Sequence, residues 1–337
     1  MDKLRLLAFC ASISLIAPLP VQAVGEFTYD GNTFIIYYSC VGVYPLTSIR
    51  LQEKVWIFSK DQAPMRGKVT QVIPAAEAEK KFDALSLDKV RNNKPLWSEI
   101  GCVHSFRGDM PVSLARVSAE TEGKFDIGFA IRGLPVGAWI SKGKGDSVSM
   151  GVKDNLYVRA VRHLVTDACY APDSLTRVKK FPIREGRTIV QLDIGKVKKF
   201  SPEKRRQVIE EEMQQAERIY DQSSWPKYKK VFLEELEKKV NIESVEICRF
   251  FLDGKRVLKA EKISRRTGVD ERVDTAPDLN ADSWANTTGS AISFISLNEG
   301  KDWDALFVDV GFEGINYSIQ RLDSPDVLYS RSLYTSH

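Results

Sequence analysis

The sequence predicts an α+β protein built mainly of antiparallel β-sheets, with a central helical pair and a C-terminal β-meander. Three observations predict this class. The most strongly helical stretch lies in the middle of the chain, between Ser201 and Val240. Short segments rich in β-branched and aromatic residues lie on both sides of it. The helices that a parallel α/β fold needs between its strands are missing.

The first 23 residues have the three parts of a signal peptide. Lys3 and Arg5 are basic, residues 6–16 are apolar, and 21–23 read Val-Gln-Ala. This pattern predicts cleavage after Ala23 and export to the periplasm or the medium. The apolar run is too short to cross a bilayer, so we expect no transmembrane span.

Beyond the signal peptide, chain length predicts two domains. The expected boundaries are 24–200 for a β-rich α+β domain, and 201–337 for the helical pair followed by antiparallel strands. The full chain has 49 basic and 45 acidic residues, which gives a net charge of +4. Because both signs are dispersed along the chain, charge gives no support to nucleic-acid binding.

Four cysteines remain after the signal peptide: Cys40, Cys102, Cys169 and Cys248. An even number in an oxidising compartment predicts two disulfides, for which three pairings exist. We favour Cys40–Cys102, since both flank predicted strands of the N-terminal part. By difference, Cys169–Cys248 would then bridge across the helical pair. No CxxC spacing indicates a redox or zinc site.

The N-terminal part is predicted to begin with a hairpin that turns at Asp30-Gly31. One helix is expected over 75–90. The other elements read as strands, over 54–58, 68–74, 110–118, 124–131, 146–152, 155–165 and 187–195.

Two helices are predicted between Ser201 and Val240. Ser201 suits an N-cap, and Pro202 suits a first turn, where no N–H is needed. Pro226 is tolerated only in the first turn of a second helix. A charged amphipathic helix can bind a membrane surface or a partner. We favour a solvated outer face packed on a sheet, because acidic and basic residues are mixed on the polar side.

The C-terminal part is predicted to be strands joined by short turns. A hairpin over 243–264 turns at Asp253-Gly254, and a polar loop follows over 265–289. Residues 291–334 then alternate apolar and polar side chains between short turns. This pattern predicts an antiparallel meander with one face in water.

Candidate catalytic groups are few. Ser147 follows Gly145-Asp146, a motif that presents the nucleophile in some hydrolases. The histidines are His104, His163 and His337, and none has the aspartate three residues earlier that would complete such a site. Without a base the serine is an ordinary hydroxyl. Acidic residues around position 303 are expected to be solvated turn residues. No cofactor or metal is expected.

Aromatic residues in the C-terminal third are the predicted partner-binding residues, because Tyr and Trp anchor many interfaces. They are Trp284, Trp303, Tyr317 and Tyr329. The resulting hypothesis is a non-enzymatic periplasmic protein that binds another protein or an envelope component. An inhibitor or immunity protein against an exported toxin is one version. The alternatives are a secreted hydrolase with a dispersed site and an accessory subunit of an envelope assembly.

Overall fold

The structure is a computed structural model. It describes residues 27–334 except 38–39, 45–47, 61, 86–88, 90–91, 93–102, 104–105, 107–110, 121–124, 143–145, 152–154, 166–168, 170–173, 221–223, 241, 267–289 and 311–313. The predicted signal peptide lies outside these residues. Most described residues belong to antiparallel strands, so the α+β class is confirmed.

The first unit is a closed barrel of six antiparallel strands in the order β1-β2-β5-β4-β3-β6, with β6 pairing back to β1. The alternation of apolar side chains in these strands fills the barrel interior, where Phe34, Ile57 and Ala130 meet. Its strands are β1 (Thr33–Tyr37), β2 (Cys40–Val43), β3 (Lys54–Ser59), β4 (Met65–Pro74), β5 (Ser113–Ala119) and β6 (Ile127–Arg132).

Two five-stranded sheets complete the body. The long-strand sheet has the order β12-β11-β10-β9-β8, and the meander sheet the order β16-β15-β14-β13-β7. The strands of the first are β8 (Asp146–Gly151), β9 (Leu175–Pro182), β10 (Thr188–Lys199), β11 (Ile242–Asp253) and β12 (Arg256–Arg266). Those of the second are β7 (Trp139–Ile140), β13 (Ser290–Ser296), β14 (Asp304–Val310), β15 (Gly314–Arg321) and β16 (Val327–Tyr334).

In the part of the chain that the structure describes, the strands are accompanied by the helices α1 (Ala75–Asp83), α5 (Leu156–Val161), α6 (Pro202–Ile219) and α7 (Trp225–Lys239). The short 3-10 turn η1 (Arg162–Leu164) follows α5. Among the described residues, no helix combines the length and apolar character needed to cross a bilayer.

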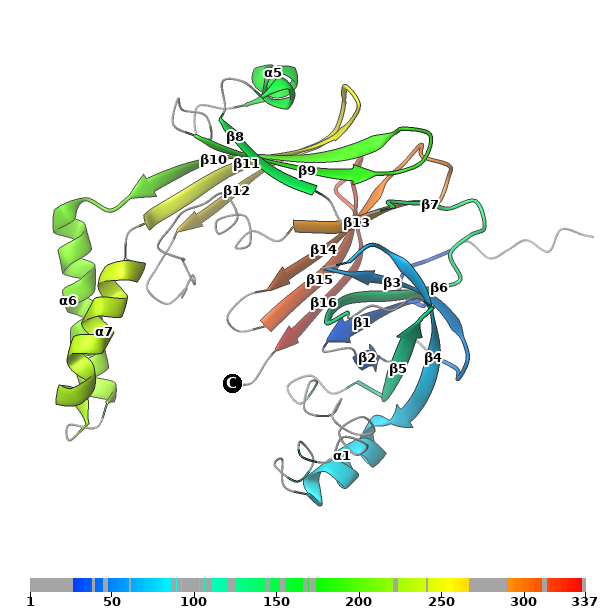
Figure 1. Ribbon diagram of the computed structural model, residues 1–337, viewed down its shortest axis with the longest axis horizontal. Helices are drawn as coiled ribbons and strands as arrows, with labels where there is room; N and C mark the ends of the chain where they lie inside the picture. The colour runs from blue at the N-terminus through cyan, green and yellow to red at the C-terminus, as the bar shows by residue number, and fades with distance from the viewer. Residues whose placement is uncertain are drawn as a thin grey trace, which may run out of the picture.

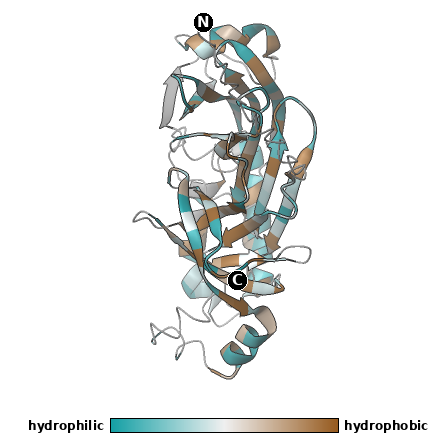
Figure 2. Ribbon diagram, turned by 90° about the vertical axis from the view of Figure 1, so that its right-hand side faces the viewer, coloured by the Kyte–Doolittle hydropathy of each residue, from teal (hydrophilic) through white to brown (hydrophobic). Residues whose placement is uncertain are grey.

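The body is a stack of layers (Figure 1). One apolar cluster joins the outside of the barrel to one face of the meander sheet, through pairs such as Phe129 and Tyr317. A second joins the opposite face of that sheet to the long-strand sheet, where Phe294 meets Phe181 and Phe251. Helix α5 covers the far side of the long-strand sheet. Apolar residues accordingly lie on the strands in the middle of the molecule (Figure 2).

The C-terminal meander is confirmed, and its expected wet face is present at β15 and β16, where Asn316, Ser330 and Ser332 are exposed. It is absent at β14, where positions 304–308 are all buried and both faces of the strand are covered. The barrel covers one face and the long-strand sheet covers the other. Sequence alternation shows which residues share a face, whereas the neighbouring layers decide whether that face meets water.

The expected domain boundary at residue 200 falls inside one sheet. Strands β10 and β11 flank it, and they pair from Ile189↔Asp253 to Lys199↔Ile242. Helices α6 and α7 are therefore an insertion between two neighbouring strands. They pack against each other and extend away from the sheets, and we call them the arm (Figure 1). The predicted packing of these helices on a sheet is wrong.

Three local predictions also differ from the structure. Residues 155–165 form α5 and η1 rather than a strand, because the Asn155 side chain accepts a hydrogen bond from the backbone N–H of Tyr157 and caps a helix. No hairpin forms at Asp30-Gly31 within the described residues; β1 pairs with β2 and β6 instead. The turn between β11 and β12 is Gly254-Lys255, where Gly254 has a φ of 61° that suits glycine.

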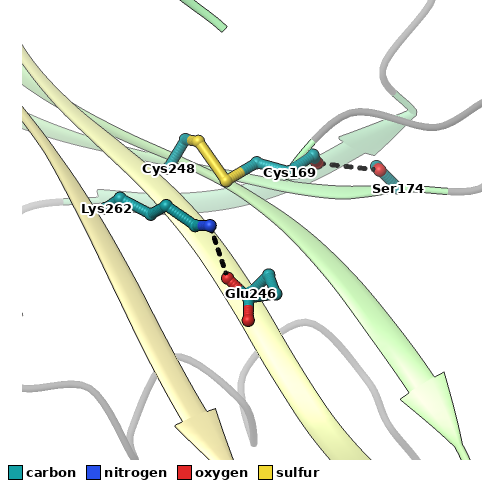
Figure 3. The surroundings of a disulfide bond; sticks show 5 residues. All are labelled: Cys169, Ser174, Glu246, Cys248 and Lys262. Atoms are coloured by element: carbon teal, nitrogen blue, oxygen red, sulfur yellow. Dashed lines mark hydrogen bonds and ion pairs between the residues drawn. A yellow bond between two sulfur atoms is a disulfide. The ribbon is translucent and has the colours of Figure 1, made fainter. Parts of the chain in front are cut away.

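The predicted disulfide Cys169–Cys248 is present, with Cα atoms 5.7 Å apart and 79 positions between the cysteines in sequence. It fastens the segment after α5 to β11 (Figure 3). The hydroxyl of Ser174 donates to the carbonyl of Cys169 at 3.0 Å. Cys40 is also disulfide-bonded. Its predicted partner, Cys102, lies outside the described residues.

We expect Cys169→Ala/Cys248→Ala to lower the free energy of unfolding by about 2–4 kcal/mol, because the bond restricts the unfolded chain over a long loop that contains the whole arm. Urea denaturation of both proteins without reductant measures the change. Urea denaturation of the double variant with reductant is the control, because it measures what the remaining disulfide of Cys40 contributes. Equal free energies of unfolding, or free thiols at these two positions in the native protein, would contradict the prediction.

Candidate functional site

The predicted partner-binding aromatics are mostly interior residues. Trp303 is 1% exposed and packs at 6.5 Å from Trp139. Tyr317 is fully buried, and its hydroxyl donates to the carbonyl of Ile36 in the barrel at 2.9 Å. Tyr329 is half-buried against the barrel cluster. Trp284 lies outside the described residues. Burial leaves Trp303 and Tyr317 no surface for a partner, so they act here as layer contacts.

Of the candidate catalytic serine and histidines, the structure describes two, which lie on different elements. Ser147 lies in β8, and exposed His163 lies in η1; His104 and His337 lie outside the described residues. Asp304 and Asp309 point to opposite faces of β14, because they are five positions apart in one strand. Within the described part of the chain, no group of three His, Cys, Asp or Glu residues could hold a metal ion.

Asp304 instead joins two layers. It accepts hydrogen bonds from the Tyr29 hydroxyl at 2.9 Å and from Arg321 Nε at 2.8 Å. Burial raises the pKa of the Asp304 carboxyl, although the bonds from Arg321 and Tyr29 oppose this shift. Burial and the neighbouring carboxylate both raise the pKa of Tyr29. The group therefore fastens the barrel to the meander sheet.

A row of charges crosses the long-strand sheet on the side that faces the meander sheet. Arg177, Asp193, Arg249 and Glu261 occupy one register position on β9, β10, β11 and β12. Arg249 Nε lies 2.7 Å from Asp193 Oδ1, and Arg249 Nη1 lies 3.7 Å from Glu261. Burial alone would lower the pKa of Arg249, but Asp193 outweighs it and the pKa is raised.

This ionic row is part of the contact between two sheets. Beside it, Lys179 Nζ donates to the carbonyl of Ala291 at 2.8 Å, and Lys259 Nζ donates to Gln320 at 3.0 Å. Arg249 and Asp193 are only 2% and 1% exposed. Neither reaches solvent, so the row supports the body rather than a surface site.

The arm is the remaining candidate, and its base is firmly attached. The hydroxyl of Ser201 accepts from the backbone N–H of Lys204 at 3.2 Å, which confirms the predicted N-cap. Arg205 Nε donates to the carbonyl of Val240 at 2.8 Å and so joins α6 to the end of α7. Glu243 pairs with Lys198 and Lys204, and their hydrogen bonds lower its pKa to about 2.

The two helices share a small apolar core of their own. Ile209 on α6 meets Leu236 and Val240 on α7. Toward the free end, the ring of Tyr220 stacks on Trp225 at 5.6 Å, and Trp225 packs edge-on against Phe232 at 5.7 Å. These contacts fix the angle between the helices and close the end of the hairpin.

Beyond this core, the free end of the arm exposes large apolar side chains. We call residues 217–220 and 224–231 the arm tip. The exposed fractions are 71% for Ile219, 44% for Tyr220, 57% for Tyr228 and 54% for Val231. Four exposed side chains of this size near one end form a patch of the kind that marks interaction sites.

The same residues helped to define the apolar faces in the sequence. Ile219, Tyr220, Tyr228 and Val231 match the helical period, and that pattern predicted buried positions. They are exposed because the arm leaves the sheets and, among the described residues, the apolar core of each helix is shared with the other helix. The sequence did carry one signal of this exposure: the two helices have more apolar residues than they can bury against each other.

Comparison with known proteins finds no matching family model, curated protein or solved structure.

Proposed function

We propose that this protein is an exported, non-enzymatic binding protein that contacts its partner through the arm tip. Export rests on the signal-peptide pattern of the first 23 residues. The observation that carries the binding proposal is the exposed apolar tip of the arm, which extends away from the sheets.

Two properties of the arm support this role. First, the insertion joins two neighbouring strands that pair with each other from Ile189↔Asp253 to Lys199↔Ile242, with one register shift beside the arm at Lys198/Lys199, so the pairing itself holds β10 and β11 together. Second, the arm tip is held in one shape by the Tyr220–Trp225–Phe232 stack and by the attachments at its base. A preformed surface binds at a lower entropic cost than one that must fold on contact.

Site-specific photocrosslinking in cells that make the protein tests this proposal. Tyr228 or Val231 is replaced by p-benzoylphenylalanine, and irradiation is expected to yield a discrete adduct. Val136, exposed on the loop between β6 and β7, provides the matched control on the body. Adducts from Val136 but none from the arm tip would contradict the proposal.

The identity of the crosslinked molecule distinguishes the two versions of the proposed function. A soluble toxin or enzyme would make the protein an inhibitor or immunity protein. A component of an envelope complex would make it an accessory subunit.

A further inference from the structure

The arm is unevenly charged along its length. Residues 217–231, which include the arm tip, contain four basic residues and two acidic ones. The two segments behind the tip, 207–216 and 232–237, contain six glutamates and no lysine or arginine. The polar faces of the arm are therefore positive at the free end and negative in the middle.

The basic side chains of the tip lie among its apolar ones. On α7, Lys227 and Lys230 are one turn apart, and so are Tyr228 and Val231. On α6, exposed Arg218 precedes exposed Ile219. Lysine stems and tyrosine rings can keep their polar ends in water while their apolar parts enter a less polar phase. This mixture suits the boundary between headgroups and acyl chains.

From these observations, and resting on the proposed function, we infer that the partner of the arm tip is an anionic membrane surface. Charge complementarity favours this occupant: the four basic residues meet lipid phosphates while Ile219, Tyr228 and Val231 enter the interface.

The dimensions agree with end-on contact. From the end of α7 nearest the tip, Val231 lies about 9 Å along the helix, which matches the depth of roughly 5–10 Å that interfacial helices reach. Glu234 lies about 13 Å from the same end of α7, and Glu212 about 10 Å from the neighbouring end of α6, so both glutamates lie behind Val231 rather than at the free end. An arm lying flat would instead bring the glutamates against the anionic surface.

Vesicle co-sedimentation of the mature protein tests the inference. The probes are vesicles of phosphatidylcholine alone and vesicles of equal parts phosphatidylcholine and phosphatidylglycerol. Binding to the anionic vesicles is expected to be stronger, and to weaken as salt is added. Equal binding to both vesicles, or binding to neither, would overturn the inference.

Matched variants locate the contact. Lys227→Glu/Lys230→Glu is expected to weaken binding by roughly thirtyfold or more, since each basic residue near an anionic surface contributes about fivefold. Tyr228→Ser/Val231→Ser is expected to weaken it by about tenfold. Lys255→Glu/Lys301→Glu makes the same charge change on exposed turns of the body and should bind like the natural protein. If that control loses affinity equally, binding is not through the arm tip.

The result is separable from that of the crosslinking experiment. Adducts of the arm tip with a protein, together with failure to bind anionic vesicles, would overturn the membrane inference and leave the proposed function standing. Tip positions that crosslink to lipid support both. Failure in both experiments would reject the arm tip as a binding surface.

Discussion

Arg249→Met is expected to lower the free energy of unfolding by about 3–5 kcal/mol, because it leaves the carboxylate of Asp193 buried without its closest cation. Arg249 is the central member of the ionic row, with Asp193 at 2.7 Å on one side and Glu261 at 3.7 Å on the other. Urea denaturation followed by circular dichroism measures the loss.

The double variant Asp193→Leu/Arg249→Met is the control. Removing both charges replaces an ion pair by apolar side chains and avoids the uncompensated carboxylate, so it should cost less than the single change. A single variant that loses under about 1 kcal/mol would show that Asp193 is not buried as the structure has it. A double variant less stable than the single one would show that other contacts of the row dominate.

Trp303→Ala is expected to destabilise the protein by about 3–5 kcal/mol, the usual cost of truncating a large buried aromatic. The indole packs against Trp139, and the guanidinium of Arg187 lies over both rings, 5.8 Å from that of Trp303 and 5.3 Å from that of Trp139. Arg187 also pairs with Asp253 and donates to the carbonyl of Gly300, so this site joins the two sheets. Thermal unfolding measures the effect.

Tyr228→Ala is the matched aromatic control, since Tyr228 is exposed and should change stability by only about 0.5 kcal/mol or less. Together the two variants separate folding from binding. A Trp303→Ala protein of natural stability that has lost its partner would restore Trp303 as a binding anchor and contradict its packing role.

Local patterns predicted most strands and both long helices. The hairpin of β11 and β12 and the meander β13–β16 were predicted within a few residues, because alternation and turn residues act over short distances. Ser201 and Pro226 likewise placed the starts of α6 and α7, since capping satisfies backbone groups of the first turn only. The segment 155–165 failed because a short apolar run fits both a strand and a helix.

The candidate site was not predicted as such. The sequence identified an amphipathic helical pair, yet its apolar residues were expected to pack on a sheet. Whether Tyr228 and Val231 are buried depends on what lies opposite them, and this depends on where the insertion leaves the long-strand sheet. No local pattern encodes that direction.

By itself, therefore, the sequence determined the α+β class, the antiparallel meander, the helix starts and a list of three disulfide pairings, one of which contains Cys169–Cys248. The strands and helix starts follow from residue propensity, side-chain period and capping, which act within a few residues. The disulfide list follows from the number of cysteines, since four cysteines allow three pairings. Only the tertiary structure decided that β14 is covered on both faces, that four charges share one register across β9–β12, and that the arm stands clear of the body. Each of these depends on segments far apart in the chain, because burial and register are properties of the surfaces that meet.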